Sequence, residues 1–241
     1  GITALARSEY VGNLEELNLF NNHIGVEGVR SLSQSEPLKN LKILNLWGNQ
    51  IGPQGAGALA GSPHLTRLVA LDLTGNGIGP EGARALAQSP GLNQLKVLRL
   101  GKNGIGDAGL AALAQSPHLT HLETLVLYEN DLGPRGLEAL GESPHLTRLK
   151  ELNLAKNRMA DAGVEALAGS TNLQRLEILD LQWNAISPQG AAALSDSAHL
   201  SSLRILKMWG NPIGEKGARR IAESPHLKNV TNTIYPGDFS P

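Results

Sequence analysis

The chain has 241 residues, of which 21 are Lys or Arg and 22 are Asp or Glu, so its formal net charge is −1. That balance lacks the basic excess by which proteins bind nucleic acid or anionic membranes, and we expect neither partner. There is no cysteine, which excludes disulfides, thiolate metal sites and thiol nucleophiles.

The start of the chain, GITALARSEY, lacks the basic and long apolar regions of a secretory signal. No apolar run reaches the length of a membrane-spanning helix. We therefore expect a soluble, cytoplasmic protein, unless a signal was removed ahead of residue 1. A monomer is also expected.

One pattern, LxxLxLxxN, organises almost the whole chain. It begins at Leu14 and recurs every 27 residues without insertion or deletion, at Leu41, Leu68, Leu95, Leu122, Leu149, Leu176 and Leu203. Eight full copies occupy residues 14–229. Residues 1–13 match the second half of a copy, and residues 230–241 begin a ninth copy that degenerates into a C-terminal cap. Because stacked repeats share one continuous core, we treat 1–241 as a single domain.

Each copy predicts one strand followed by one short helix. In residues 41–49, LKILNLWGN, leucines alternate with other residues in the period of two that is typical of a strand. In residues 53–63, PQGAGALAGSP, apolar residues recur at spacings of three, and a proline stands at the first helical position, where its missing N–H costs nothing. Because all copies run in the same direction, we expect a parallel sheet with helices stacked behind it.

The extended pattern LxxLxLxxNxIGxxGxxxLAxSPxL resembles that of the leucine-rich repeat superfamily, and its length and full helix are similar to those of the ribonuclease-inhibitor-like subclass. The resemblance implies an α/β fold: a right-handed curved solenoid, or horseshoe, with a concave parallel β-sheet and convex α-helices. It also implies protein recognition rather than catalysis. The ribonuclease inhibitors are rich in cysteine and acidic residues and this chain is not, so their target is not implied here.

Three repeated residue types are best explained by structure. Asparagine ends the strand of every copy, where it can turn inward and bond main-chain groups. Glycine recurs in the first helical turn, where a side chain would collide with a neighbouring copy. Histidine recurs in SPHL, and bonds to helix-end carbonyls or stacking explain it better than metal binding, so neither metal nor cofactor is expected. The asparagines are Asn22, Asn49, Asn76, Asn103, Asn130, Asn157, Asn184 and Asn211, and the histidines are His64, His118, His145, His199 and His226.

Function is expected at the variable strand positions, which line the concave face of such a solenoid. Five of the eight aromatic residues fall at two of the 27 repeat positions, and Trp47 is one of them. Because Leu44 and Leu46 point to the core, Trp47 points to the other face. We expect these rings to be exposed, and exposed aromatic residues are enriched at binding hot spots. Packing between neighbouring strands would explain the isoleucines on this face better than the tryptophans.

The candidate residues form two groups with a charged stretch between them. One group comes from copies one and two and the other from copies seven and eight, roughly 25 to 30 Å apart at the spacing of neighbouring strands. Our hypothesis is an interface in which two aromatic clusters hold a protein partner and the central charges set its register. The candidate protein-binding residues are Phe20, Ile43, Trp47, Arg99, Lys102, Tyr128, Ile178, Trp183, Ile205 and Trp209.

Two other interpretations stay open. Tryptophan faces beside Asn18, Asn45 and Asp72 could stack on sugar rings and bond them, which would make the chain a carbohydrate or small-ligand binder. The chain could also be an engineered or consensus repeat scaffold without a natural partner, because regular periodicity and absent cysteine are common design choices. Catalysis is not expected, since Asp72 and Asp180 are separated by about 20 Å, too far for an acid–base pair.

Overall fold

The sheet is built from short parallel strands that pair in chain order. The computed structural model describes residues 1–232, and it places nine strands in that range. From β1 to β8, each strand pairs with the equivalent residues one copy later, so that Glu16 faces Ile43 and Leu17 faces Leu44. The last pair is shifted by one residue, because Ile205 faces Thr231. The strands are β1 (Glu16–Asn18), β2 (Ile43–Asn45), β3 (Ala70–Asp72), β4 (Val97–Arg99), β5 (Thr124–Val126), β6 (Glu151–Asn153), β7 (Ile178–Asp180), β8 (Ile205–Lys207) and β9 (Thr231–Asn232).

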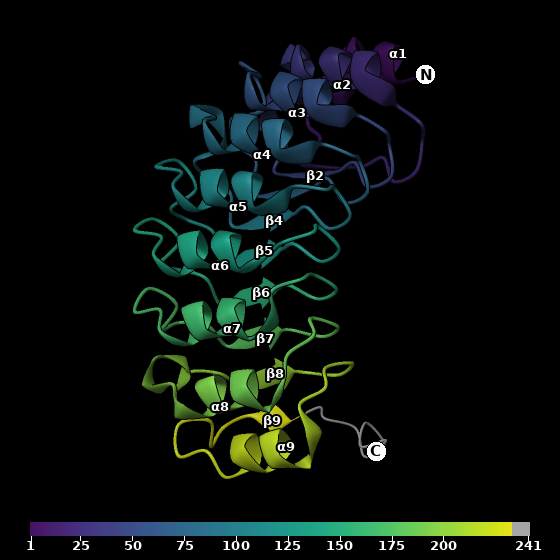
Figure 1. Cartoon of the computed structure of the whole chain (residues 1–241). Coiled ribbons are helices and arrows are strands. Elements are labelled where there is room, and N and C mark those ends of the chain that lie inside the picture. Colours follow the sequence, from purple (N-terminus) through teal and green to yellow (C-terminus); the bar gives the residue numbers. More distant parts are fainter. Residues whose placement is uncertain (233–241) are drawn as a thin grey trace.

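Helices cover one face of this sheet, one for each copy (Figure 1). Within residues 1–232, none of them is both long and apolar enough to cross a membrane. The α-helices are α1 (Ile2–Ala6), α2 (Gly25–Ser33), α3 (Gly52–Ala60), α4 (Gly79–Ala87), α5 (Gly106–Ala114), α6 (Pro134–Gly141), α7 (Ala160–Ala168), α8 (Pro188–Asp196) and α9 (Gly214–Ala222). Short 3-10 helices follow some of them: η1 (Glu9–Val11), η2 (Glu36–Asn40), η3 (Pro90–Leu92) and η4 (Ala198–Leu200).

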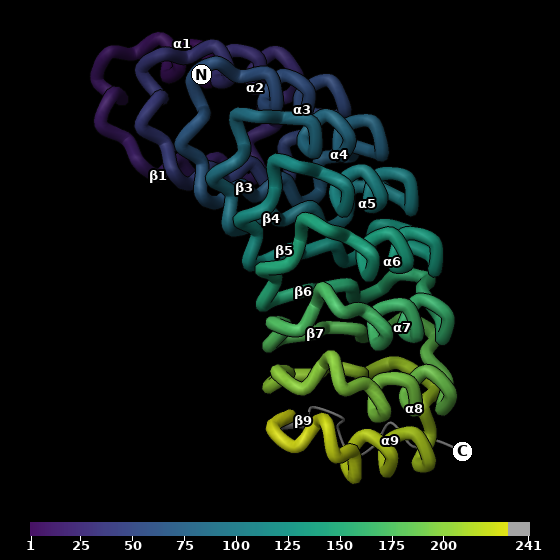
Figure 2. The backbone as a smooth tube through the Cα atoms, turned by 90° about the vertical axis from the view of Figure 1, so that its left-hand side faces the viewer, coloured from purple at the N-terminus to yellow at the C-terminus, as the bar shows by residue number. Residues whose placement is uncertain are grey.

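The copies stack into a curved solenoid. Strands line one side and helices the other, and the N-terminal copies bend toward the strand side (Figure 2). A strand pair is narrower than a helix pair, because strands pack about 4.8 Å apart and helices need 8 to 10 Å. The difference bends the stack, with the strands inside. The predicted α/β solenoid with a concave parallel sheet and convex helices is thus confirmed.

Leucine side chains form one core between sheet and helices. In copy two, Leu41, Leu44 and Leu46 are 0 to 1% exposed, as are their equivalents in the following copies. Alternation along three-residue strands sends every second side chain into this core. The intervening side chains are left on the concave face.

Serine and glycine join the copies on the helical side. The Ser62 hydroxyl donates to the Ser33 carbonyl one copy earlier at 2.6 Å, and its oxygen accepts from the N–H of His64. Within residues 1–232, the helix-end carbonyls are therefore bonded by the serine of this segment, whereas bonding by the histidine side chain was one of the two structural roles expected for it. At Gly82, an added Cβ would lie 2.9 Å from Ile78 of its own copy and 3.1 Å from Ala56 of the previous one. The predicted collision occurs, but it involves the glycine's own copy as well.

The two ends differ. Residues 1–13 form α1 and η1, the helical half of a copy, as their sequence predicts. Strand β9 begins the expected ninth copy and pairs with β8. Arg220 on α9 reaches back to α8 and donates to both carboxylate oxygens of Asp196 at 2.8 and 2.9 Å. The remainder of the predicted cap, residues 233–241, lies outside the described residues.

Candidate functional site

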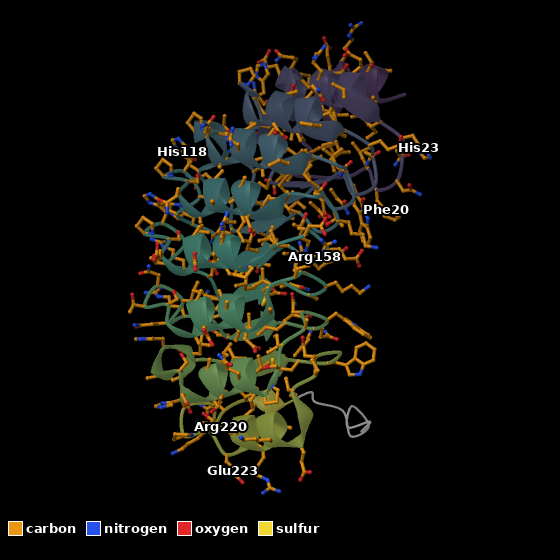
Figure 3. All side chains as sticks on the ribbon, viewed as in Figure 1. Phe20, His23, His118, Arg158, Arg220 and Glu223 are labelled. Atoms are coloured by element: carbon orange, nitrogen blue, oxygen red, sulfur yellow. The ribbon has the colours of Figure 1, made fainter. Side chains whose placement is uncertain are left out.

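Aromatic side chains meet in two pairs on the concave face. Phe20 and Trp47, which follow β1 and β2, pack edge to face with ring centroids 5.0 Å apart. Trp183 and Trp209, which follow β7 and β8, do the same at 4.5 Å. These four residues stay 38 to 49% exposed. In Figure 3, Phe20 lies on the side of the molecule opposite His118, which is in the turn between α5 and β5.

Three isoleucines extend these pairs toward the other end of the strands. Ile43 begins β2 and is 40% exposed. Ile178 and Ile205 begin β7 and β8, are half-buried, and face each other in register. We call Phe20, Ile43 and Trp47 the N-terminal aromatic cluster, and Ile178, Trp183, Ile205 and Trp209 the C-terminal aromatic cluster. The structure brings together the residues that the sequence assigned to each group.

The residue that follows each aromatic position has a left-handed backbone in all eight copies. Glycine fills this position in three copies, where the conformation carries no steric cost. Trp183 is the bulkiest occupant, with φ at 56°. A left-handed backbone costs a non-glycine residue about 1 to 2 kcal/mol. The residues are Asn21, Gly48, Gly75, Lys102, Glu129, Lys156, Trp183 and Gly210. The left-handed backbone at this position was not predicted from the sequence, although its three glycines were a signal.

Glycines also seat the aromatic rings. A Cβ at Gly101 would overlap the ring of Tyr128, and one at Gly210 would overlap the indole of Trp183. Trp47 lies against Gly75, with 3.5 Å between its Cδ1 and the place of a Cβ. Tyr128 is half-buried as a result, and this burial raises the pKa of its phenol, with the charges of Asp72 and Glu129 acting in the same direction. The Tyr128 side chain is thus less exposed than the sequence led us to expect.

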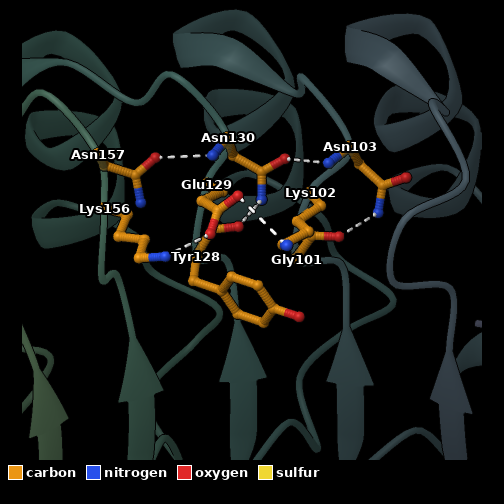
Figure 4. Close-up of polar contacts among 8 residues, drawn as sticks. All are labelled: Gly101, Lys102, Asn103, Tyr128, Glu129, Asn130, Lys156 and Asn157. Carbon is orange, nitrogen blue, oxygen red and sulfur yellow. Dashed lines mark hydrogen bonds and ion pairs between the residues drawn. The ribbon is translucent and has the colours of Figure 1, made fainter.

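Charged side chains occupy the centre of the face. Glu129 accepts from Lys156 at 3.0 Å and lies 3.5 Å from Lys102, so one carboxylate is shared by two ammonium groups (Figure 4). The hydrogen bond from Lys156 is the main reason why the pKa of Glu129 lies below its usual value. Arg99, on β4, is exposed, and no carboxylate within residues 1–232 pairs with it.

Asparagine and aspartate on the strands hold the chain where it leaves the sheet. The Oδ1 atoms of Asn18, Asn45 and Asp72 accept from the N–H two residues later at 2.9 to 3.1 Å. Asn153 and Asp180 do the same in copies six and seven. Asn18, Asn45 and Asp72, which the sequence offered as partners for sugars, thus already use one side-chain oxygen within the protein.

The asparagine that recurs after each strand has a structural role, as predicted. Asn130 accepts from the N–H of Asn103, and its own N–H donates to Asn157, which joins three copies (Figure 4). Asn76 donates to the carbonyls of Leu46 and Leu73 at 2.9 Å each. Asn76 is 3% exposed, so it cannot contribute to a binding surface.

Little on this face suits metal binding or catalysis. Across residues 1–232, no group of three or more His, Asp or Glu side chains is placed to hold a metal ion. Asp72 and Asp180 lie on β3 and β7, four strands apart. Lys207 pairs with Asp180 at 3.4 Å, and Gln182 also donates to that carboxylate. The face is arranged for contacts over a broad area, with no enclosed centre among the described residues.

The comparisons with known proteins agree with this architecture. In solved structures, the chain is similar to an internalin (InlF) from Listeria monocytogenes, with 20% identity and a TM-score of 0.59, covering 98% of this chain and 71% of that one. It is also similar to internalin C2 from Listeria monocytogenes, with 27% identity and a TM-score of 0.59, covering 94% of this chain and 84% of that one. No match is found among curated proteins.

A family model described as leucine-rich repeat matches more than half of the chain. The matched segments are residues 13–33, 38–60, 62–87, 92–114, 118–141, 144–168 and 172–195. They follow the 27-residue period of strands and helices described above. The chain therefore belongs to the leucine-rich repeat family.

Proposed function

We propose that this chain is a non-catalytic scaffold whose concave face binds a protein partner through the N-terminal and C-terminal aromatic clusters. The observation that carries the proposal is the exposure of two edge-to-face aromatic pairs on the concave face. Exposed tryptophans are frequent hot spots of protein interfaces, where a partner can remove them from water.

The backbone of Trp183 supports the same conclusion. Trp183 has a left-handed backbone, with φ at 56°. Three other copies have glycine at this position, and glycine adopts such a backbone without steric cost. A tryptophan here costs folding free energy and still leaves 46% of the side chain in water. Strain of this kind is typical of functional positions, because folding alone would favour the cheaper residue.

The spacing of the clusters fits an extended partner segment or a convex folded surface. Strands β2 and β7 are five steps apart in the sheet, which corresponds to about 24 Å. An extended segment of about seven residues covers that distance. A segment held at both ends would lie along the concave face and pass over its central charges.

Carbohydrate binding is less well supported. Stacking on the tryptophans would be possible, but sugar hydroxyls need free acceptors beside the rings. The Oδ1 atoms of Asn18 and Asn45 accept from the N–H groups of Phe20 and Trp47. Titration of tryptophan fluorescence with a panel of glycans separates the two functions, because a protein-binding face gives no saturable change.

We also propose that the chain falls in the ribonuclease-inhibitor-like subclass. Helices α2 to α9 are full α-helices of eight or nine residues on the convex side. A 27-residue period provides the length that such a helix needs. This classification concerns the scaffold only and carries no target with it.

The proposal is tested with Trp47→Ala and Trp209→Ala, one for each cluster. Tyr10→Ala is the matched control, because Tyr10 is an aromatic residue on η1 that is 99% exposed. Partners captured with the wild-type protein are measured against all three variants, and circular dichroism checks the fold. We expect both tryptophan variants to bind at least about tenfold more weakly and the control to bind normally. Undiminished binding in both tryptophan variants contradicts the proposal.

A further inference from the structure

We infer that the partner places an acidic side chain, Asp or Glu, against Arg99 in the middle of the concave face. The inference rests on the proposed function, because it concerns a partner that spans the two aromatic clusters. It adds the chemistry of the central contact and the position of that contact along the partner. Three properties of copies four and five carry it.

The first property is an unpaired guanidinium. Arg99 ends β4 and faces Asp72 on β3 and Val126 on β5 in register. Asp72 is the nearest carboxylate in the sheet order, but it accepts from the N–H of Thr74 and makes no ion pair with Arg99. The equivalent cation of copy eight, Lys207, does pair with Asp180 at 3.4 Å. Within residues 1–232, Arg99 is thus a strand cation on this face that lacks a carboxylate.

The second property is a pair of main-chain N–H groups without an acceptor. In copies one, two, three, six and seven, an Asn or Asp side chain holds the N–H two residues later. Copies four, five and eight have Arg99, Val126 and Lys207 at that place, and none of these side chains can accept. Consequently the N–H groups of Gly101 and Tyr128 have no acceptor in the described chain. Oriented N–H groups create positive potential, here beside the guanidinium.

The third property is a surplus of positive charge. Lys102 and Lys156 share the single carboxylate of Glu129, at 3.5 and 3.0 Å. With Arg99, three cations therefore lie near two carboxylates, those of Glu129 and Asp72, at the centre of the concave face. By contrast, Arg158 and Asp131 neutralise each other at 3.0 Å at its edge. Complementary charge selects an anionic group on the partner and fixes its register.

The position of Arg99 decides which carboxylate it receives. Arg99 lies between the two clusters, two strands from β2 and three strands from β7. A partner that touches both clusters must continue in both directions past Arg99. A chain terminus cannot do so, and therefore the carboxylate belongs to an Asp or Glu side chain.

The same geometry predicts where that side chain stands in an extended partner. Two strand steps are about 10 Å and three are about 14 Å. At about 3.3 Å for each residue, the acidic residue lies about three positions from one apolar anchor and about four from the other. A twelve-residue peptide is long enough to contain all three.

The experiment uses a library of random twelve-residue peptides, displayed on phage through their C-termini so that no free terminal carboxylate is present. Selection is carried out on the full chain. We expect the selected peptides to share an Asp or Glu between two apolar residues at the spacing above. Selection on Arg99→Glu should lose this preference or replace it with Lys or Arg.

Affinities are then measured by fluorescence polarisation with one selected peptide, synthesised with an amidated C-terminus. Arg99→Glu should weaken binding about fivefold or more, because attraction turns into repulsion. Arg84→Glu is the matched control, since it makes the same charge change at an exposed position of α4 and should leave binding within about twofold. Glu129→Gln should tighten binding about twofold, a gain that misfolding cannot produce.

The outcomes separate this inference from the proposed function. Peptides that depend on Trp47 and Trp209 but show no acidic preference, or that bind Arg99→Glu normally, overturn the inference and leave the proposed function in place. If no peptide is selected, the inference is overturned. If the selected peptides bind Trp47→Ala and Trp209→Ala normally, the proposed function is wrong and the inference is wrong with it.

Discussion

The ring of Tyr128 occupies the place that a side chain at Gly101, one copy earlier, would fill. Glycine is found here without any conformational need, since Gly101 does not have a positive φ. Its role is to provide the space in which the ring rests. The relationship joins two neighbouring copies and explains why Tyr128 is half-buried while Trp47 and Trp209 stand further out.

Gly101→Ala should displace this ring toward solvent. The backbone accepts alanine and the phenol ring is a movable obstacle, so we expect a loss of stability below about 1 kcal/mol. The pKa of Tyr128, which burial raises, should fall toward its ordinary value. NMR titration of the tyrosine ring signals in the wild type and the variant measures this change. An unchanged Tyr128 pKa would show that the ring does not depend on Gly101 for its position.

Asn76→Ala should be among the most destabilising single changes in the scaffold. The Asn76 side chain accepts from the N–H of Asn49 and donates to the carbonyls of Leu46 and Leu73. Its removal leaves buried main-chain groups without partners, at a cost of about 1 to 3 kcal/mol for each group. We expect a loss of about 3 kcal/mol in urea unfolding followed by tryptophan fluorescence.

Asn22→Ala is the matched control for that measurement. Asn22 occupies the same repeat position in copy one but is exposed and donates only to the carbonyl of Phe20. Water can replace such a bond, so the expected loss is below about 1 kcal/mol. Equal losses at Asn22 and Asn76 would contradict the view that burial, rather than the bond itself, sets the cost.

The scaffold was predictable because its determinants repeat. The alternation of Leu44 and Leu46 identifies the buried face of the strand, and Asn49 marks the turn that follows it. Equivalent residues recur in all eight copies, so the same pattern can be read eight times. The aromatic clusters were also predictable, because strand alternation sends Trp47 to the face opposite the leucines.

The remaining features of the site depend on relationships between copies. The orientation of the Tyr128 ring depends on Gly101, which is 27 positions earlier in the chain and lies directly beside the ring. The bond from Asn45 to the N–H of Trp47 depends on a backbone bend that periodicity does not reveal. No ion pair joins Arg99 to Asp72, which faces it in register, although Lys207 pairs with the equivalent Asp180. Such pairings require three-dimensional distances.

Trp183→Gly should be more stable than Trp183→Ala. Both variants lose the contact with Trp209, but only alanine retains the cost of the left-handed backbone at φ 56°. The difference should be about 1 kcal/mol in favour of glycine. Thermal unfolding of the two variants measures it directly. Both should lose partner binding to the same extent, since both lack the indole. If alanine proves as stable as glycine, the backbone of residue 183 relaxes once the indole is gone, and the strain argument for Trp183 fails.

Acid should remove the contribution of the Glu129 carboxylate to stability. In the folded state the hydrogen bond from Lys156 keeps the pKa of Glu129 below the usual value of 4.5. The unfolded chain therefore takes up a proton at higher pH than the folded chain. Consequently the stabilisation is fully present above the usual pKa and is lost as the pH falls through the lowered folded pKa.

Glu129→Gln measures this contribution. At pH 7 and low salt, the variant should be less stable by about 0.5 kcal/mol, a small value because the ion pairs are solvent-exposed. The difference from the wild type should persist above the usual pKa of 4.5 and disappear as the pH falls through the lowered folded-state pKa. Glu16→Gln is the control, because Glu16 is an exposed carboxylate on β1 that has no ion pair within residues 1–232. A Glu129→Gln difference that grows in acid would mean that the carboxylate is stabilised in its protonated form, contrary to the geometry of Lys102 and Lys156.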